Sequence, residues 1–313
     1  MTTAETGARI TFKNVQFLTD FSEPSEAALP FAVAIAREFG ATIHALHVLI
    51  LEPLLYATAD VTATAISAVE ESARAGMQRV ESQLAGVPHK TTVIRGAAVW
   101  PSLEAVMGDS NIDLIILGTH GRTGVQKVLL GSVAEEIFRR APVPVMTIGP
   151  RVRNAAHNGA RFSRILFATD FTPESLAATP HAISLAEENE AQLILIYVIK
   201  REQNVANRPE EKSIANAMHD LLELVPKDAE LWCRPEAVVD YGDPADRILQ
   251  TAAERHADLV VLGVRDAGRH MGTATHIGNA IAHKIVARAS CPVLTARGHV
   301  STSQFGSPNH HLL

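Results

Sequence analysis

The chain contains 313 residues, of which 47% are hydrophobic, 20% are charged and 5% are aromatic, with a formal net charge of −6. This length favours two domains, and the mainly aliphatic core material suits buried parallel sheets covered by helices. The charges are interspersed, which excludes a basic surface for nucleic acid, and no apolar run reaches the length of a membrane span. We therefore expect a soluble cytoplasmic protein with neither nucleic acid nor membrane as partner.

Strand and helix patterns alternate along the first half of the chain. Short apolar runs predict strands near residues 14–19, 42–49, 90–95, 113–118 and 143–148. Helical patterns lie between them, near residues 24–39, 60–84, 100–109 and 131–140. Pro24 suits the first turn of the first helix, and Gly40 suits the position just after its end. This alternation predicts right-handed crossovers and a parallel α/β sheet with helices on both faces.

The second half of the chain repeats the first. Four segments return in the same order: 15–22 as 165–172, 41–48 as 191–198, 113–118 as 258–263, and 143–146 as 291–294. Four ordered matches exclude coincidence and predict two tandem domains. The second helix of the second half, near 209–225, is expected to be shorter than its counterpart.

The domain boundaries follow from the repeat and from composition. We predict a first domain over residues 10–150 and a second over 162–297. The segment 151–161, rich in Arg, Asn and Gly, has the composition of a linker. The tail at 298–313 has little core-forming material and is expected to be disordered. The two cysteines, Cys233 and Cys291, match no metal or redox spacing.

The stretch after the fourth predicted strand has the parts of a phosphate-binding loop. The strand ends at Gly118, Gly121 follows, and Gly131-Ser132 opens a helical pattern. Glycines let backbone N–H groups approach an anion closely, and a helix N-terminus carries partial positive charge. Ser132 can add a hydroxyl donor. The alternative is that the glycines only permit tight turns, but the strand before them and the helix after them favour ligand binding.

Other candidate ligand-binding residues follow the predicted strands. Asp20, Val48 and Gly118 all stand at carboxyl ends of strands, where open α/β sheets bind their ligands. Asp20 offers a carboxylate to a base amine or a ribose hydroxyl. His120 lies inside the glycine-rich loop, where it could donate a hydrogen bond to phosphate. No Walker lysine, catalytic triad or metal-ligand spacing stands out, so we predict no catalytic or metal-binding residues.

The motifs resemble those of a known family. The pattern Gly-x-x-Gly, nine residues, Gly-Ser is filled by Gly118, Gly121, Gly131 and Ser132. Together with Thr19–Ser22 and His47-Val48, it makes the chain similar to a tandem universal stress protein, a likeness that covers both halves. The resemblance implies two open five-stranded parallel sheets of the adenine nucleotide alpha hydrolase type. It further implies that these sheets pack as a pseudo-dimer through their last strands, and it favours a homodimer of chains.

The same resemblance implies a set of residues that bind ATP in the first domain. Asp20 and the backbone of Val48 would hold the adenine end, and Gly118 would lie against the ribose. Gly121, Gly131 and Ser132 would hold the phosphates, and Val133 completes the predicted set. The resemblance does not decide whether the resident nucleotide is ATP, ADP or AMP, or whether Mg²⁺ accompanies it. Leu18 stands where some ATP-binding members of the family carry proline.

The second copy of the loop is altered. It keeps Asp170, Val198 and Gly263, but Asp266 replaces Gly121 and would place a carboxylate against phosphate. Its loop, from Ala267 to Gly278, is about three residues longer when Pro144 is aligned with Pro292. Gly278-Asn279 or Asn279-Ala280 then takes the place of Gly131-Ser132. We predict weak ATP binding or none in the second domain.

Three functions remain in competition at this point. The leading one is an ATP-binding regulator of the stress response with an unknown protein partner, in which occupancy changes conformation or partner binding. The second is a slow ATPase or nucleotide hydrolase, with His120 as its candidate residue. The third is a structural dimerisation module that binds no nucleotide.

Overall fold

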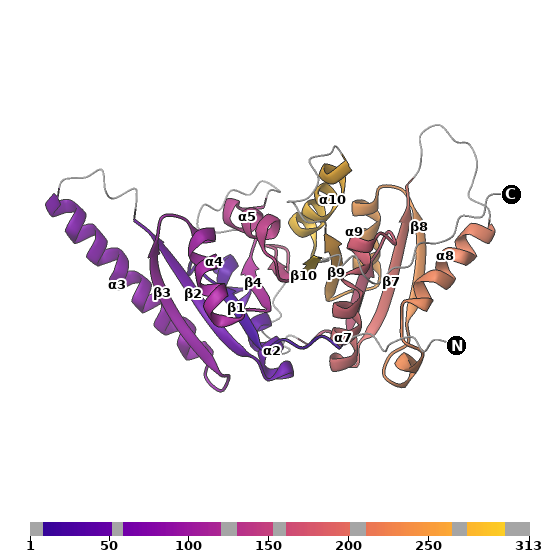
Figure 1. Ribbon diagram of the computed structural model, residues 1–313, viewed down its shortest axis with the longest axis horizontal. Helices are drawn as coiled ribbons and strands as arrows, with labels where there is room; N and C mark the ends of the chain where they lie inside the picture. Colours follow the sequence, from indigo (N-terminus) through magenta and orange to yellow (C-terminus); the bar gives the residue numbers. More distant parts are fainter. Residues whose placement is uncertain are drawn as a thin grey trace.

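The computed structural model describes residues 9–51, 59–119, 130–152, 161–200, 211–264 and 274–297. The two halves of the chain have one repeated α/β arrangement (Figure 1). The first half contains β1 (Asn14–Leu18), α1 (Glu23–Glu26), α2 (Leu29–Phe39), β2 (Thr42–Ile50), α3 (Ala59–Gln83), β3 (His89–Gly96), α4 (Val99–Ser110), β4 (Leu114–Gly118), α5 (Ser132–Arg140) and β5 (Val145–Ile148). The second half contains β6 (Arg164–Ala168), α6 (Pro173–Leu176), α7 (Thr179–Asn189), β7 (Gln192–Ile199), α8 (Glu211–Glu223), the 3-10 helix η3 (Lys227–Leu231), β8 (Glu236–Tyr241), α9 (Pro244–Glu254), β9 (Leu259–Val264), α10 (Ala274–Arg288) and β10 (Val293–Arg297).

The strands form one continuous sheet across both halves. Their order is β3-β2-β1-β4-β5-β10-β9-β6-β7-β8, and the neighbours within each half are parallel. The central pair, β5 and β10, is antiparallel, with Met146 opposite Leu294. The side chains of Thr147 and Thr295 each donate to a backbone carbonyl of the facing strand at 3.2 Å. This pairing confirms the predicted pseudo-dimer of two parallel sheets joined through their last strands.

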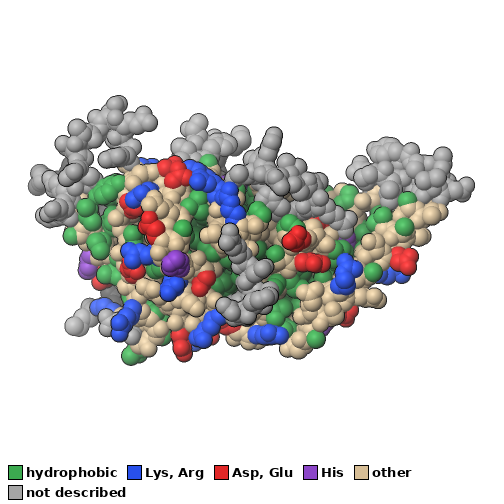
Figure 2. Space-filling view, turned by 180° about the vertical axis from the view of Figure 1, so that it is seen from behind, with side chains coloured by type: hydrophobic (Ala, Val, Ile, Leu, Met, Phe, Trp, Pro, Cys, Tyr) green, Lys and Arg blue, Asp and Glu red, His purple; other side chains and the backbone are tan. Residues whose placement is uncertain are grey.

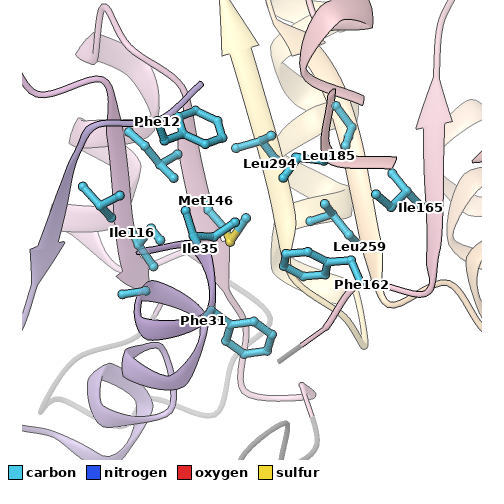
Figure 3. Packing of buried hydrophobic residues seen from close by; sticks show 14 of the residues in the cluster. Phe12, Phe31, Ile35, Ile116, Met146, Phe162, Ile165, Leu185, Leu259 and Leu294 are labelled. Atoms are coloured by element: carbon cyan, nitrogen blue, oxygen red, sulfur yellow. The ribbon is translucent and has the colours of Figure 1, made fainter. Parts of the chain in front are cut away.

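Helices cover both faces of the sheet. Buried side chains of α2, α3, α7 and α8 pack on one face, and those of α4, α5, α9 and α10 pack on the other. The first of these cores runs without a break from one half to the other, as Met146, Phe162 and Leu294 show (Figure 3). Because β5 and β10 are buried at the centre of the sheet, neither is an exposed edge that would pair with another chain.

The first helix of each half is broken, which differs from the single helix predicted over 24–39. Proline 30 has no N–H to donate to the carbonyl of Glu26, and its ring would clash with that carbonyl in a continuous helix. The chain therefore ends α1 at Glu26 and begins α2 at Leu29. Pro180 separates α6 from α7 in the same way. The break leaves α1 and α6 as short helices beside the carboxyl ends of β1 and β6.

Aromatic residues link the two halves on the face of the sheet that α2 and α7 cover. The Phe12 ring, from the segment before β1, lies 6.3 Å from the His181 ring of α7. The equivalent Phe162, before β6, stacks on Phe31 of α2 with the ring centroids 6.3 Å apart. Figure 3 shows Phe31 and Phe162 facing one another across the boundary between the halves. Each half thus places an aromatic side chain on the first long helix of the other.

A half-buried carboxyl group also lies at this boundary. Asn189 of α7 donates through its side-chain amide to Glu38 of α2. The pKa of Glu38 is raised to about 7, mainly by burial and also by nearby Glu188, against the opposing effects of the Asn189 hydrogen bond and Arg161. The folded protein therefore holds this proton at pH values where the unfolded chain, with the ordinary carboxyl pKa of 4.5, has lost it.

Stability should consequently fall as the pH rises from about 4.5 to about 7 through Glu38. The variant Glu38→Gln keeps an acceptor for Asn189 and cannot ionise. We expect it to exceed the wild type in free energy of unfolding by about 1 kcal/mol at pH 8, a discounted value because the carboxyl is partly solvated. The two proteins should be equal at pH 4. Urea unfolding at both pH values measures this, with Glu104→Gln on an exposed part of α4 as the control; a wild-type stability advantage at pH 8 would contradict the assignment.

The surface carries both signs of charge over the same regions. Figure 2 shows acidic and basic side chains intermixed over the visible face. Within the described ranges, no helix has the length and apolar character that crossing a membrane requires.

Candidate functional site

A pocket lies at the carboxyl ends of β1, β2 and β4, where α5 begins. Its unfilled space, including the open mouth, is about 880 Å³. Six of the predicted site residues line it: Asp20, Val48, Gly118, Gly131, Ser132 and Val133. The structure therefore brings together six of the eight predicted residues. The other two, His120 and Gly121, lie outside the described residues.

A strained turn presents Asp20 to this pocket. Phe21 has a left-handed backbone (φ 61°), which costs a non-glycine residue roughly 1 kcal/mol. The turn is stabilised because the Phe21 ring packs on His47 with a centroid distance of 4.4 Å, and its N–H donates to the Thr19 hydroxyl at 3.0 Å. Ser22 donates to Asp20 Oδ1 through its backbone N–H at 3.0 Å and through its hydroxyl. The carboxylate of Asp20 is thereby fixed at the end of β1.

His47 reinforces the same corner of the pocket. Its side chain is buried, and its Nδ1 lies 2.7 Å from the carbonyl oxygen of Thr19. Because a carbonyl only accepts, Nδ1 carries a proton and donates it there. The Thr19 N–H in turn donates to the Leu46 carbonyl at 3.1 Å, which extends the pairing of β1 with β2 beyond Leu18. His47 thus positions the strand ends that carry Asp20 and Val48.

Gly118 lines the pocket, and the packing of α1 leaves no room for a side chain at this position. A Cβ added at this position would lie 2.5 Å from the Pro24 carbonyl oxygen and 3.1 Å from the Ser25 nitrogen. Both atoms belong to the backbone of α1, which rests directly on the end of β4. In the second half, a Cβ at Gly263 would lie 2.2 Å from the Glu174 carbonyl oxygen of α6. The presence of glycine at this position therefore reflects helix packing in both halves.

The N-terminus of α5 faces the pocket. Gly131 is the N-cap residue, with extended backbone; its N–H donates to the Thr119 carbonyl and its carbonyl accepts from Glu135, both at 2.8 Å. The three N–H groups between them, of Ser132, Val133 and Ala134, precede the first intrahelical donor and have no intrahelical acceptor. No side chain among the described residues caps the helix. These three residues line the pocket, so the positive end of the helix dipole is directed at it.

Several lining residues were not singled out by the sequence, among them Ser25 and Val99. Ser25 of α1 is buried and donates to the Thr19 hydroxyl at 2.7 Å, and Val99 at the start of α4 forms part of the wall. The repeat carried a signal for the first of them, because Ser175 stands at the equivalent position and lies 2.8 Å from the Thr169 hydroxyl. Val99 has no such signal, since α4 and α9 differ at their starts.

The second half has a pocket of about 730 Å³ at the equivalent place. Asp170, Val198 and Gly263 line it as predicted. Thr172 donates to Asp170 Oδ1 through its backbone N–H at 3.1 Å and its hydroxyl at 2.6 Å. Phe171 repeats the left-handed backbone of Phe21, with φ of 60°. The corner that presents the aspartate is therefore the same in both halves.

The helix that follows the loop differs between the halves, and one expectation was wrong. We expected Gly278-Asn279 or Asn279-Ala280 to replace Gly131-Ser132 at the helix start. Instead, α10 begins at Ala274, so all of these residues lie inside the helix. Alignment of Pro144 with Pro292 sets Ala280 opposite Ser132, so α10 starts six residues earlier than α5. Asp266 and residues 265–273 lie outside the described residues.

The family model of the universal stress proteins matches this chain twice, over residues 11–149 and 161–297. The chain belongs to the universal stress protein family. Both halves are therefore universal stress protein repeats, and the recognition made from the glycine pattern is confirmed. The ranges matched leave out the first ten residues, the segment between the halves and the tail.

Individual universal stress proteins are similar to this chain over one of its halves or over both. One from Mycolicibacterium smegmatis is 25% identical over 298 residues, covering 89% of this chain and 95% of that protein. One from Methanocaldococcus jannaschii is 32% identical over 142 residues, which is 44% of this chain and 82% of that protein. The crystal structure of one from Archaeoglobus fulgidus covers 91% of this chain and 98% of its own, with a TM-score of 0.65 and 22% identity. This last likeness shows that the two-repeat fold is shared.

The described residues offer neither a metal-binding cluster nor a reactive thiol. Within the described ranges, no group of three or more His, Cys, Asp or Glu side chains could hold a metal ion. Cys233 and Cys291 are buried free thiols, and burial raises the pKa of Cys233 to about 11 and of Cys291 to about 12. Neither thiol is an activated nucleophile at neutral pH, because the thiolate is the reactive form.

Proposed function

We propose that the first-half pocket binds ATP, with the adenine end near Asp20 and Val48 and the phosphates at the start of α5. The observation that carries this proposal is the N-terminus of α5, whose uncapped N–H groups line the pocket at Ser132 and Val133. An anion at that place would accept these N–H groups and lie at the positive end of the helix dipole. The glycine pattern of the preceding loop also supports placing the phosphates at this end of the pocket.

The charges of the lining residues support the orientation. Among the described lining residues, Asp20 is the one carboxylate, and it lies at the ends of β1 and β2, away from α5. A carboxylate there suits an amine or a hydroxyl as donor and would repel phosphate. Mg²⁺ would enter with the nucleotide and be held mainly by its phosphates, since these lining residues offer no second carboxylate near α5.

We further infer that ATP acts as a regulatory ligand in the stress response. The family supports this role, and so does the presence of one complete glycine pattern beside an altered one. Regulation requires that the protein with ATP and the protein without it bind a partner differently. Affinity capture from a lysate of stressed cells, with and without ATP, tests this; the same bound proteins in both samples would refute the regulatory role.

ATP binding itself is tested by calorimetry on the full chain. We expect about one ATP per chain, because the first pocket has an available helix N-terminus and the second does not. Titrations with ADP, AMP and cyclic AMP rank the phosphate requirement; cyclic AMP is included because another universal stress protein was crystallised in complex with it. The nucleotide that copurifies is identified by chromatography of the denatured protein. No measurable binding, or about two ATP per chain, would contradict the proposed site.

A further inference from the structure

The second-half pocket keeps the aspartate end of the first pocket and loses the anion-binding end. Asp170 sits in the same turn as Asp20, and Ile196 and Val198 of β7 form the same wall as Leu46 and Val48 of β2. Burial alone would raise the pKa of Asp170, but hydrogen bonds from Thr172 and Ser175 outweigh it and leave the pKa lowered. The carboxylate is therefore ionised at neutral pH and retains acceptor capacity, since a carboxylate offers about four lone-pair sites.

The opposite end of this pocket is lined by aliphatic side chains. Ile281 and Ala282 of α10 stand where Val133 and Ala134 begin α5, and Val264, the last residue of β9, takes the place of Thr119. Leu262 and Ile248 complete this wall. Where the first pocket has a buried hydroxyl at Thr119, the second has a buried methyl surface. A ligand group at this end would be held by apolar contact.

The start of α10 removes the helix N–H groups that would donate to phosphate, and the charged residues that line the pocket beside Asp170 are Glu174 and Lys200, one of each sign. Because the helix begins six residues before Ala280, the N–H groups at positions 280 to 282 point along a continuing helix and bond to its own carbonyls. The N-terminus of α10 is displaced by roughly 9 Å along its axis relative to that of α5. The positive end of the dipole is displaced with it, and its effect falls off within the first turn.

Ion pairs hold α10 in this position. Lys284 lies 3.1 Å from Asp243 and 3.0 Å from Asp246, and Arg288 lies 2.7 Å from Asp246. Both aspartates belong to the start of α9, so the network fastens α10 across the outer side of the pocket. In the first half, the residues aligned with Lys284 and Arg288 are Glu136 and Arg140, which pair with each other within α5 at 2.9 Å. The anchoring of α10 on α9 is therefore a feature of the second half.

We propose that the second-half pocket is a binding site for a nucleoside whose 5′ end is uncharged and apolar, distinct from the nucleotide of the first half. Asp170 would accept a hydrogen bond from the base or ribose, and the wall formed by Ile281, Ala282 and Val264 would contact the 5′ substituent. The choice of a nucleoside rests on the proposed function of the first pocket, whose aspartate end this one repeats. The pocket of about 730 Å³ falls in the usual range for small-molecule sites.

The test uses the full chain with ATP present in saturating amount, so that the first pocket is filled. The probe is 5′-deoxy-5′-methylthioadenosine, a nucleoside with an apolar 5′ group. Calorimetry should show about one molecule bound per chain. The variant Ile281→Phe fills the apolar end and should weaken this binding on the order of tenfold or more while ATP affinity stays unchanged.

The matched variant Val133→Phe alters the aligned position in the first pocket. It should weaken ATP binding and leave the methylthio nucleoside bound. If the proposed function of the first pocket is wrong, the pattern is different: the protein does not bind ATP, and the nucleoside still binds at the second pocket. The inference is overturned if ATP prevents all nucleoside binding in the wild type, or if nucleoside affinity is the same in wild type and Ile281→Phe. Circular dichroism confirms that each variant is folded; if Ile281→Phe is not, Asp170→Asn replaces it, with the same loss of nucleoside binding expected.

Discussion

Replacing Gly121 by aspartate should weaken ATP binding by on the order of 100-fold, or about 2.7 kcal/mol. The substitution copies Asp266 of the second half into the glycine-rich loop of the first. A carboxylate about 4 Å from a phosphate is repelled by about 4 kcal/mol per pair of charges near a protein surface, and part of this is relieved by rotation and solvent. Calorimetry at low and high salt measures the effect, which should shrink at high salt because screening weakens the repulsion.

The control for this variant is Gly121→Asn. Asparagine has nearly the size of aspartate and no charge, so the difference between the two variants isolates the repulsion from the loss of glycine. We expect Asn to retain most of the ATP affinity that Asp loses. Equal affinities for wild type and Gly121→Asp would show that the loop does not contact phosphate.

The reverse change, Asp266→Gly, should not restore ATP binding to the second half. Removing the carboxylate leaves α10 beginning at Ala274, so the helix N–H groups remain bonded within the helix. A gain of a second ATP per chain in this variant would show that charge alone disables the site.

Replacing Gly118 by alanine should lower the free energy of unfolding by about 1–3 kcal/mol and also reduce ATP affinity. The added Cβ would come within 2.5 Å of the Pro24 carbonyl oxygen, and the neighbouring contacts are backbone atoms that cannot rotate away. Relief requires α1 to move outward, which shifts the turn that carries Asp20. Chemical unfolding gives the stability, and calorimetry gives the affinity.

The repeat supplies a matched variant for this prediction. Gly263→Ala should cause a similar loss of stability, because its Cβ would meet the Glu174 carbonyl oxygen, while leaving ATP binding intact. The exposed helical Gly108 has nothing within 4 Å of its added Cβ, and Gly108→Ala should stabilise the protein by about 0.5–1 kcal/mol. If Gly118→Ala were as stable as the wild type, the close packing of α1 on β4 would be wrong.

The fold followed from the sequence because its signals were local and came twice. Alternating strand and helix patterns, repeated in order, determined the parallel sheets, and Gly40 ends α2 with a left-handed φ of 65° as expected. The family resemblance supplied the pairing of the last strands, which local patterns do not specify. The break between α1 and α2 was also readable from the sequence, since Pro30 forbids a continuous helix.

The residues of the candidate site could be predicted from the sequence, but the tertiary contacts that explain their positions could be predicted less well. Asp20, Val48 and Gly118 were expected at one rim because the carboxyl ends of strands meet there, and all three line the same pocket. The need for glycine at 118 depends on the approach of α1, which is a tertiary contact with no sequence pattern. The start of α10 at Ala274 was missed because Gly278 resembled the glycine before α5, whereas the helix continues through it.

The antiparallel pairing of β5 with β10 has a consequence for how the two halves can diverge. In a dimer of identical chains every substitution occurs twice, so a change that suits one partner is imposed on the other as well. Here the two partners are one polypeptide, and a residue can change on one side of the pseudo-twofold axis alone. In the repeat, His181 takes the position of Phe31 and Asn189 takes that of Phe39. His181 contacts Phe12 and Asn189 contacts Glu38, whereas Phe31 contacts Phe162. Fusion thus lets the two pockets change independently within one continuous sheet, where a symmetric pair would have two copies of one pocket.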